Sequence, residues 1–179
     1  NPNEWMRHNV EYTAKAFLGL TFNCAHCHDH KYDPIAHEDY FRLRAIFEPA
    51  VQVQAKTSVS VLMESQGVPP TSHLLIRGDW KRRGPEVEAA FPRIANPWHQ
   101  EVSTANHNGA SSGRRSALAR WITRMDNPLT TRVIVNRIWQ YHFGQGLSRT
   151  PSDFGLIGDN PSHPELLDWL AMEFIRNGW

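Results

Sequence analysis

The only two cysteines of the 179-residue chain stand three positions apart in the run Cys24-Ala25-His26-Cys27-His28. This C-x-x-C-H spacing is the one that attaches haem c, because each thiol can form a thioether to one vinyl group of the porphyrin. The histidine directly after the second thiol, His28, is placed to bind the iron. One short segment would therefore supply both covalent anchorage and one axial ligand.

The same tract also offers ligands for a bare metal ion. Cys24, Cys27, His28 and His30 together supply two thiolates and two imidazoles, a donor set that suits tetrahedral zinc. All four lie within seven residues, whereas a structural zinc site normally draws its second ligand pair from a separate segment. The spacing thus favours haem c over zinc. A thioredoxin-like redox pair is disfavoured further, because the preceding segment has the pattern of a helix rather than a strand.

The second axial position of such a haem has two candidates. Met63, at the end of a predicted strand, would offer a thioether that raises the haem potential, although methionine more commonly fills gaps in a core. His142 lies late in a predicted helix, where a histidine more often interacts with the end carbonyls. His30 is too close in sequence to His28 to reach the opposite face of the ring easily.

A polar helix face forms another candidate site. Arg132, Asn136 and Gln140 recur four residues apart and therefore share one face. Together with the following loop they predict either a buried hydrogen-bond network, which is favoured, or a pocket for an anion such as a haem propionate or an acidic sugar. The candidate residues are Arg132, Asn136, Arg137, Arg149 and Asp153. No catalytic residues are predicted, because the sequence has no Ser-His-Asp order, phosphate-binding glycine loop or paired carboxylates, and the question of enzyme activity stays open.

Two predicted helices flank the C-x-x-C-H loop. Apolar residues recur with helical spacing over residues 3–20 and again over residues 37–47, where Pro49 closes the second helix. The alternating pattern between Val51 and Met63 predicts a strand, and residues 73–77 predict another short one. Residues 81–112 have little periodicity and predict an irregular connector.

The last third of the sequence is helical again. One predicted helix begins at residue 112 or 113 with Leu118, Trp121 and Ile122 facing inward, and a second covers residues 130–143. A capping box of Ser162 and Glu165 predicts the start of a third, whose apolar stripe is Leu166, Leu167, Leu170 and Phe174. The fold class is therefore mainly α with a small β section (α+β). The predicted division is 1–50, 51–110 and 111–179.

Basic and acidic residues nearly balance, nineteen against eighteen, which leaves a formal charge of +1. No strong field attracts a polyanion, so no nucleic-acid partner is predicted. No stretch approaches the ~20 consecutive apolar residues of a transmembrane helix. The chain starts with Asn1 and stops just after a helical pattern, so we expect an internal piece of a longer protein, in which a missing signal peptide says nothing about export.

Long runs of the sequence resemble two families. AKAFLGLT at 14–21, CAHCHDHKYDPI at 24–35 and DY at 39–40 resemble the second cytochrome-C-like domain of planctomycete proteins, domain of unknown function 1549. A second set of segments is similar to the partner domain that follows it, domain of unknown function 1553. These segments are NPLT at 127–130, VNRIWQ at 135–140, HFG at 142–144, RTPSDFG at 149–155 and HPELLDWLA at 163–171.

The resemblance implies an exported, envelope-associated bacterial protein, periplasmic or in another extracytoplasmic compartment, and it names no substrate. Our first hypothesis is a haem c-binding electron-transfer or redox module. Its partners would be redox proteins or other domains of the same longer chain. The alternative is a scaffold stabilised by zinc or another metal, within a carbohydrate-processing system.

Overall fold

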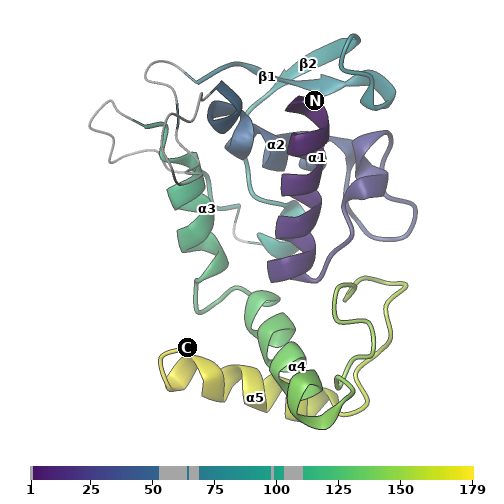
Figure 1. The fold of residues 1–179 in the computed structure, drawn as a ribbon, viewed down its shortest axis with the longest axis vertical. Coiled ribbons are helices and arrows are strands. Elements are labelled where there is room, and N and C mark those ends of the chain that lie inside the picture. Colours follow the sequence, from purple (N-terminus) through teal and green to yellow (C-terminus); the bar gives the residue numbers. More distant parts are fainter. Residues whose placement is uncertain (1, 53–63, 65–68, 98, 103–110) are drawn as a thin grey trace, which may run out of the picture.

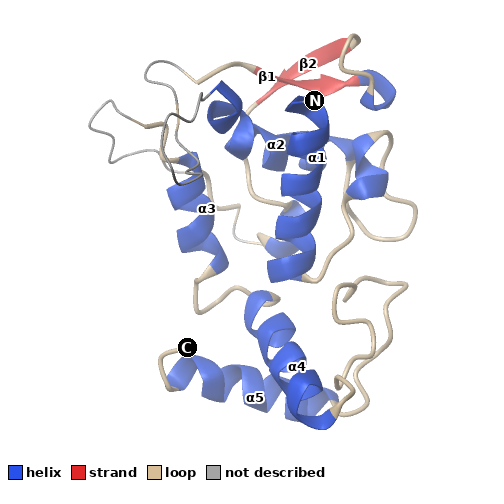
Figure 2. Cartoon of the chain, viewed as in Figure 1, coloured by secondary structure: helices blue, strands red, loops and turns tan. Residues whose placement is uncertain are grey.

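The computed structural model describes residues 2–52, 64, 69–97, 99–102 and 111–179. Within these residues, helices dominate and the one sheet is a two-stranded antiparallel hairpin, so the predicted mainly α fold with a small β section is confirmed (Figure 2). The helices are α1 Pro2–Thr13, α2 His37–Phe47, α3 Arg114–Ile122, α4 Thr130–Phe143 and α5 Pro164–Arg176, and the strands are β1 Ser72–Leu75 and β2 Arg83–Val87.

The first predicted helix is present but changes character at its end. After α1 the chain continues as a π-helical turn, Ala14–Leu18, and stops at Gly19 in the left-handed conformation with φ +61°. A glycine adopts this backbone without strain. Gly19 is also tightly covered, because a Cβ there would lie 2.7 Å from Phe154 Cδ2 and 2.8 Å from Val133 Cγ2. The helix end is therefore shaped to receive the C-terminal part of the chain.

Helix α2 begins and ends at the predicted residues. Its first turn is capped by Asp39, whose Oδ2 accepts a hydrogen bond of 3.0 Å from the Ala36 backbone N–H. The apolar face holds Tyr40, Leu43 and Phe47, all buried in the core against α1. Burial of this face, rather than intrinsic propensity, is what stabilises so short a helix.

The hairpin differs from the prediction in its second strand. Strand β1 covers residues 73–75 of the strand predicted at 73–77, but the prediction is wrong at Ile76 and Arg77, which belong to the 3-10 turn Ile76–Gly78 where the chain turns toward β2. Strand β2 lies in the segment predicted to be irregular. Gly84 and Pro85 within β2 are residues that disfavour strands, so the local sequence does not predict one. The segment is a strand because it pairs with β1, Ser72 with Val87 and Leu75 with Arg83. The strand predicted from Val51 is wrong at its first two residues, which end the 3-10 turn Glu48–Gln52, because the turn that follows α2 continues through them. The remainder, residues 53–63, lies outside the described residues.

The described residues form two hydrophobic cores. The larger one joins α1, α2, the hairpin and α3, and it contains the predicted inward residues Leu118, Trp121 and Ile122. The Trp121 ring stacks on Phe91 with 4.8 Å between centroids. The smaller core lies between α4 and α5, which form a separate pair in Figure 1. Helix α3 therefore packs with the N-terminal elements and not with the two helices that follow it.

The start of α5 corrects one prediction. The N-cap is His163, without a side-chain cap hydrogen bond, and not Ser162. Pro164 occupies the first helical position, where its fixed φ suits the helix and its missing N–H is no loss, so the helix begins one residue later than a capping box would place it. The predicted stripe of Leu166, Leu167, Leu170 and Phe174 does face the smaller core.

Candidate functional site

The C-x-x-C-H loop lies between α1 with its π-helical extension and α2, as the sequence predicted. Residues Asn23–His26 form a single 3-10 turn, in which the Ala25 side chain is buried. Cys24 and Cys27 are both free thiols and both exposed. The turn thus presents two free thiols to solvent, while the Ala25 side chain packs into the core.

Hydrogen bonds fix the loop to the helices on either side. The Phe22 backbone N–H donates to Oε2 of the buried Glu11 in α1 (2.8 Å). On the other side His37, the first residue of α2, donates through Nε2 to the His26 carbonyl (3.0 Å) and through its backbone N–H to Asp29 Oδ1 (2.7 Å). The position of the loop is therefore set by both helices.

His28, the predicted axial ligand, makes one hydrogen bond to the backbone of the next residue. Its ring is exposed, and Nδ1 lies 2.6 Å from the Asp29 carbonyl oxygen. A carbonyl can only accept, so Nδ1 is the donor and Nε2 is the ring nitrogen left to face a metal ion. A histidine that binds a metal usually donates its other ring N–H in this way.

His26, a spacer in the motif by sequence, is a structural part of the site. Its ring lies against Tyr40 and Phe41 of α2, and Nδ1 is 3.5 Å from Cys27 Sγ. Burial, with help from the nearby Arg44 charge, lowers the pKa of His26 below its ordinary value. The ring is therefore neutral near neutral pH and holds the side chain of Cys27 in place. A polar residue between two cysteines carries no sequence signal for such a role.

The turn of the β-hairpin closes one side of the motif. Gly78 has φ +72°, and a Cβ there would lie 2.5 Å from His26 Nδ1 and 3.0 Å from Cys27 Sγ. A larger residue would therefore displace both side chains. The exposed side of Cys27 is the one that remains free for chemistry.

His30, the fourth ligand of the zinc alternative, has other partners. Its Nδ1 accepts a hydrogen bond from the Asp33 backbone N–H (3.0 Å), and Nε2 lies 3.4 Å from Thr21 Oγ1. The side chain is buried beside the Asp33 carboxylate. Across the described ranges, no group of three or more His, Cys, Asp or Glu side chains is arranged to hold a metal ion.

Of the two candidates for the second axial position, Met63 lies outside the described residues. His142 is exposed near the end of α4 and lines an apolar pocket with Trp139, Leu170 and Phe174 between α4 and α5. No residue of the C-x-x-C-H loop lines that pocket.

The residues predicted to form a polar pocket each contact a different partner. Asn136 is fully buried and bonds both the N–H (2.8 Å) and the carbonyl (3.0 Å) of Ser148, as a buried network would require. Arg132 pairs with Asp168 (2.5 Å) and Arg149 with Asp159 (3.5 Å). Asp153 instead accepts from the Gly155 N–H. These contacts join α4 to α5, α4 to the following loop, or parts of that loop to each other, and the residues do not converge on one cavity.

Arg137 makes the longest-range of these contacts. Its guanidinium donates to the carbonyls of Lys15 (2.8 Å) and Ala16 (3.0 Å), in the π-helical turn that ends the first helix. A cation at a helix C-terminus is favoured by the dipole and by the unpaired carbonyls. Sequence analysis placed Arg137 in a polar pocket, but its partners lie more than 120 residues away.

The loop after α4 makes two more hydrogen bonds to the N-terminal elements. Phe154 N–H donates to the Gly19 carbonyl (2.5 Å), and Leu156 N–H donates to Asp33 Oδ1 (2.6 Å). Gly155 lies so close to Asp33 that a Cβ there would be 2.6 Å from Oδ1. We call the contacts of Arg137, Phe154 and Leu156 with the N-terminal elements the seam. It reaches the segment directly after the C-x-x-C-H motif.

The two segments of the chain that meet at the seam match different protein families. Residues 1–52 match PSCyt2, described as a protein of unknown function (DUF1549). Residues 114–179 match PSD1, described as a protein of unknown function (DUF1553). The order confirms the resemblance seen in the sequence, and the chain carries a segment of the first family followed by a segment of the second. No curated protein and no solved structure matches the chain.

Proposed function

We propose that this chain, which joins a PSCyt2 segment to a PSD1 segment, attaches haem c through Cys24 and Cys27 and serves as an electron-transfer or redox module. His28 is the proposed proximal ligand. The haem would supply one-electron chemistry. Its partners would be redox proteins or other domains of a longer chain. The proposed location is periplasmic or otherwise extracytoplasmic, where haem c is attached.

The observation that carries the proposal is the state of the three motif residues. Both thiols are free and exposed, and His28 has its Nδ1 proton committed to the Asp29 carbonyl. The residues present therefore fit a covalently held haem: two accessible sulfurs at the required spacing and one imidazole nitrogen available to iron. The zinc alternative lacks comparable support, because His30 has its own buried partners.

Each surrounding residue has a definite task in this proposal. His37 and Glu11 fix the loop backbone, His26 orients Cys27, and the hairpin turn at Gly78 excludes one approach to that thiol.

Within the described residues, none of the helices is long and apolar enough to cross a membrane.

The proposal is tested by expression in a host that matures c-type cytochromes. A denaturing gel stained for haem peroxidase activity should give a band for the intact chain and none for the Cys24→Ala/Cys27→Ala variant. His28→Ala should lower or abolish the stain, whereas His163→Ala, an exposed histidine elsewhere, should leave it unchanged. An unstained intact chain that holds one zinc per molecule by elemental analysis would replace this proposal with the metal scaffold.

A further inference from the structure

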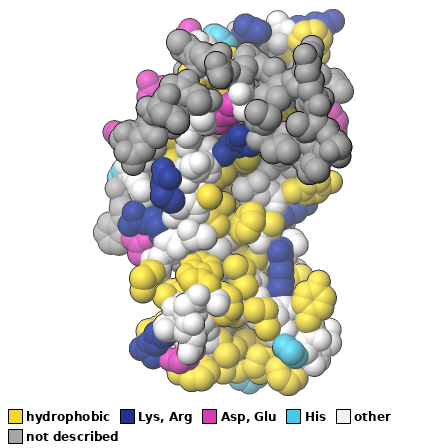
Figure 3. Space-filling model, turned by 60° about the vertical axis from the view of Figure 1, so that its left-hand side comes forward, with side chains coloured by type: hydrophobic (Ala, Val, Ile, Leu, Met, Phe, Trp, Pro, Cys, Tyr) yellow, Lys and Arg dark blue, Asp and Glu magenta, His cyan; other side chains and the backbone are white. Residues whose placement is uncertain are grey.

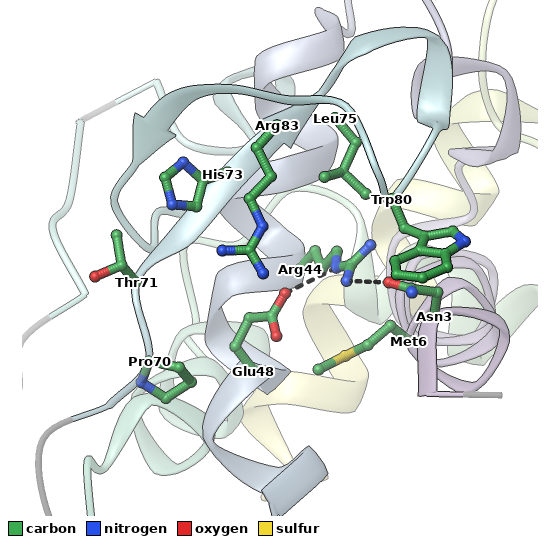
Figure 4. A pocket seen from close by; sticks show the side chains of 10 residues that line it. All are labelled: Asn3, Met6, Arg44, Glu48, Pro70, Thr71, His73, Leu75, Trp80 and Arg83. Carbon is green, nitrogen blue, oxygen red and sulfur yellow. Dashed lines mark hydrogen bonds and ion pairs between the residues drawn. The ribbon is translucent and has the colours of Figure 1, made fainter.

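A second polar site lies between α1, α2 and the hairpin, and it uses no residue of the C-x-x-C-H motif. It is a cavity of about 230 Å³ (Figure 4). The side chains that matter for its chemistry are Asn3, Arg44, Glu48, His73, Trp80 and Arg83. Two arginines line the cavity with one carboxylate, so it has a surplus of positive charge.

Arg44 is a buried cation with one donor left over. Its side chain is 9% exposed. Nε donates to Glu48 Oε1 (2.9 Å) and Nη2 to Asn3 Oδ1 (2.7 Å), as Figure 4 shows. Nη1 is buried and has no hydrogen-bond partner among the described residues. A buried donor without a partner is unfavourable, and an acceptor oxygen supplied by a ligand would satisfy it.

Arg83 supplies the second cation. It lies at the start of β2, and its side chain points toward Arg44 and Glu48 in Figure 4. Arg83 forms no ion pair with any residue that the structure describes. With Glu48 balancing Arg44, the charge of Arg83 is left for a ligand, and a single surplus charge suits a monoanion. Carboxylates and sulfate esters carry one negative charge, whereas a phosphomonoester carries nearly two.

Trp80 gives the cavity an apolar wall at its opening. The side chain lines the pocket and is 56% exposed, and the Lys81 ammonium lies 5.4 Å from the centroid of its ring. An exposed indole offers a flat face on which another ring can lie. The cavity volume of about 230 Å³ is below the usual range for drug-sized ligands and suits a single small ring.

We propose that this cavity binds a monoanionic oxyanion, a carboxylate or a sulfate ester, carried on a ring of monosaccharide size. Arg44 and Arg83 hold the oxyanion, and Trp80 covers the ring. Arginine suits this role because its planar fork matches the paired oxygens of such groups. The inference stands independently of haem attachment.

The test is calorimetric titration of the full chain with sodium D-glucuronate and with D-glucose 6-sulfate, using D-glucose as the neutral control. We expect saturable binding of at least one anion, weakening with added salt, and none of glucose. The anion that binds identifies the group as carboxylate or sulfate. Arg83→Gln should weaken binding by about tenfold, as expected for the loss of a charged hydrogen bond.

Matched variants separate the site from general surface charge. Arg82→Gln removes the same charge from the neighbouring exposed position, which does not line the cavity, and should leave affinity within about twofold, the change a screened surface charge makes. Trp80→Ala should weaken binding of the sugar anion while leaving that of acetate or methyl sulfate, the same charged groups without the ring, unchanged. Absence of saturable binding for both anions, or equal affinity in Arg83→Gln and the intact chain, would overturn the proposal. The substitutions at 80, 82 and 83 are on exposed side chains and so spare the core.

Discussion

The N-terminal body, formed by α1, α2, the hairpin and α3, differs sharply from the α4–α5 pair in how it buries apolar side chains. In the body, Val10, Leu43 and Ile46 are fully buried. In the pair, Tyr141 is 90% and Phe143 67% exposed, and apolar side chains gather over the lower part of the molecule in Figure 3. Because buried apolar area is the main stabilising term, the body should hold most of the stability.

The family boundary and the packing boundary do not coincide. The PSD1 match begins at residue 114, the first residue of α3, yet the buried residues of α3 belong to the core of the body. The α4–α5 pair is therefore connected to the body by α3 and by the seam. The predicted division at residue 110 stays a prediction, and the packing shows why cutting there should be harmful.

The largest expected effect comes from that cut. Residues 111–179 expressed alone should not fold cooperatively, because α3 would lose the core that buries Trp121 and the smaller core has only four buried apolar residues among those described. Tryptophan fluorescence through a urea titration should give a sloping curve. The complementary fragment 1–126 should show a cooperative transition. A cooperative transition of 111–179 would show that this segment folds without the body and would contradict the assignment of α3 to the core of the body.

Two tryptophans within the PSD1 segment sharpen the contrast. Trp121 is 3% exposed and stacks on Phe91, whereas Trp169 is 57% exposed. Trp121→Ala should lower the free energy of unfolding by about 3–5 kcal/mol, the usual cost of removing a buried aromatic ring. Trp169→Ala should cost less than about 1 kcal/mol. Equal losses, measured by urea unfolding of the full chain, would contradict the burial of α3 in the body.

The seam should have an intermediate effect. Arg137→Ala removes charged hydrogen bonds to the Lys15 and Ala16 carbonyls and should cost about 1.5–3 kcal/mol. Arg132→Ala, which breaks an exposed pair with Asp168, serves as the control and should cost about 0–1 kcal/mol. Hydrogen exchange should show faster opening of α4 in Arg137→Ala while α2 stays protected. Uniform loss of protection would mean that the two regions unfold as one.

The smallest effect concerns the contact that begins α3. Glu64 accepts hydrogen bonds from the Ser112 backbone N–H and the Ser111 hydroxyl. Although burial acts to raise it, the bonds to Ser112 and Ser111 leave the pKa of Glu64 below its ordinary value. Glu64→Gln should cost about 1 kcal/mol near neutral pH, comparable to the loss of a helix cap.

The pH dependence of that variant follows from the lowered pKa. The ionised Glu64 contributes its stability above the ordinary pKa of 4.5, and this contribution is lost as the pH falls through the lower folded value. The difference between the intact chain and Glu64→Gln should therefore shrink on acidification below pH 4.5. A difference in urea midpoint that is the same at neutral and acidic pH would disprove this role.

How far the sequence predicts the structure depends on the distance between the interacting residues. Helices α2 and α4 were predicted at both ends, because periodicity and local breakers define them. Strand β2 was missed, since its pairing with β1 overrides the local signals of Gly84 and Pro85. The local sequence pattern predicts individual helices well, but it does not predict which distant element packs against or pairs with each one.

The candidate site shows the same limit. The C-x-x-C-H spacing identified Cys24, Cys27 and His28 directly, since all three are neighbours in sequence. The contact of Gly78 with His26 joins segments about fifty residues apart, and the partners of Arg137 are more distant still. Neither contact leaves a local pattern, because each depends on how the chain folds back on itself.

The most direct test of the central claim, haem attachment at the C-x-x-C-H motif, is the intact mass of the full chain purified from a c-type maturation host. We predict a mass greater than that of the polypeptide by one haem, retained after denaturation, with the added mass on the peptide that contains residues 24–28. The Cys24→Ala/Cys27→Ala variant should have the mass of the bare polypeptide. An unmodified intact chain whose two thiols both react with an alkylating agent would contradict the proposal.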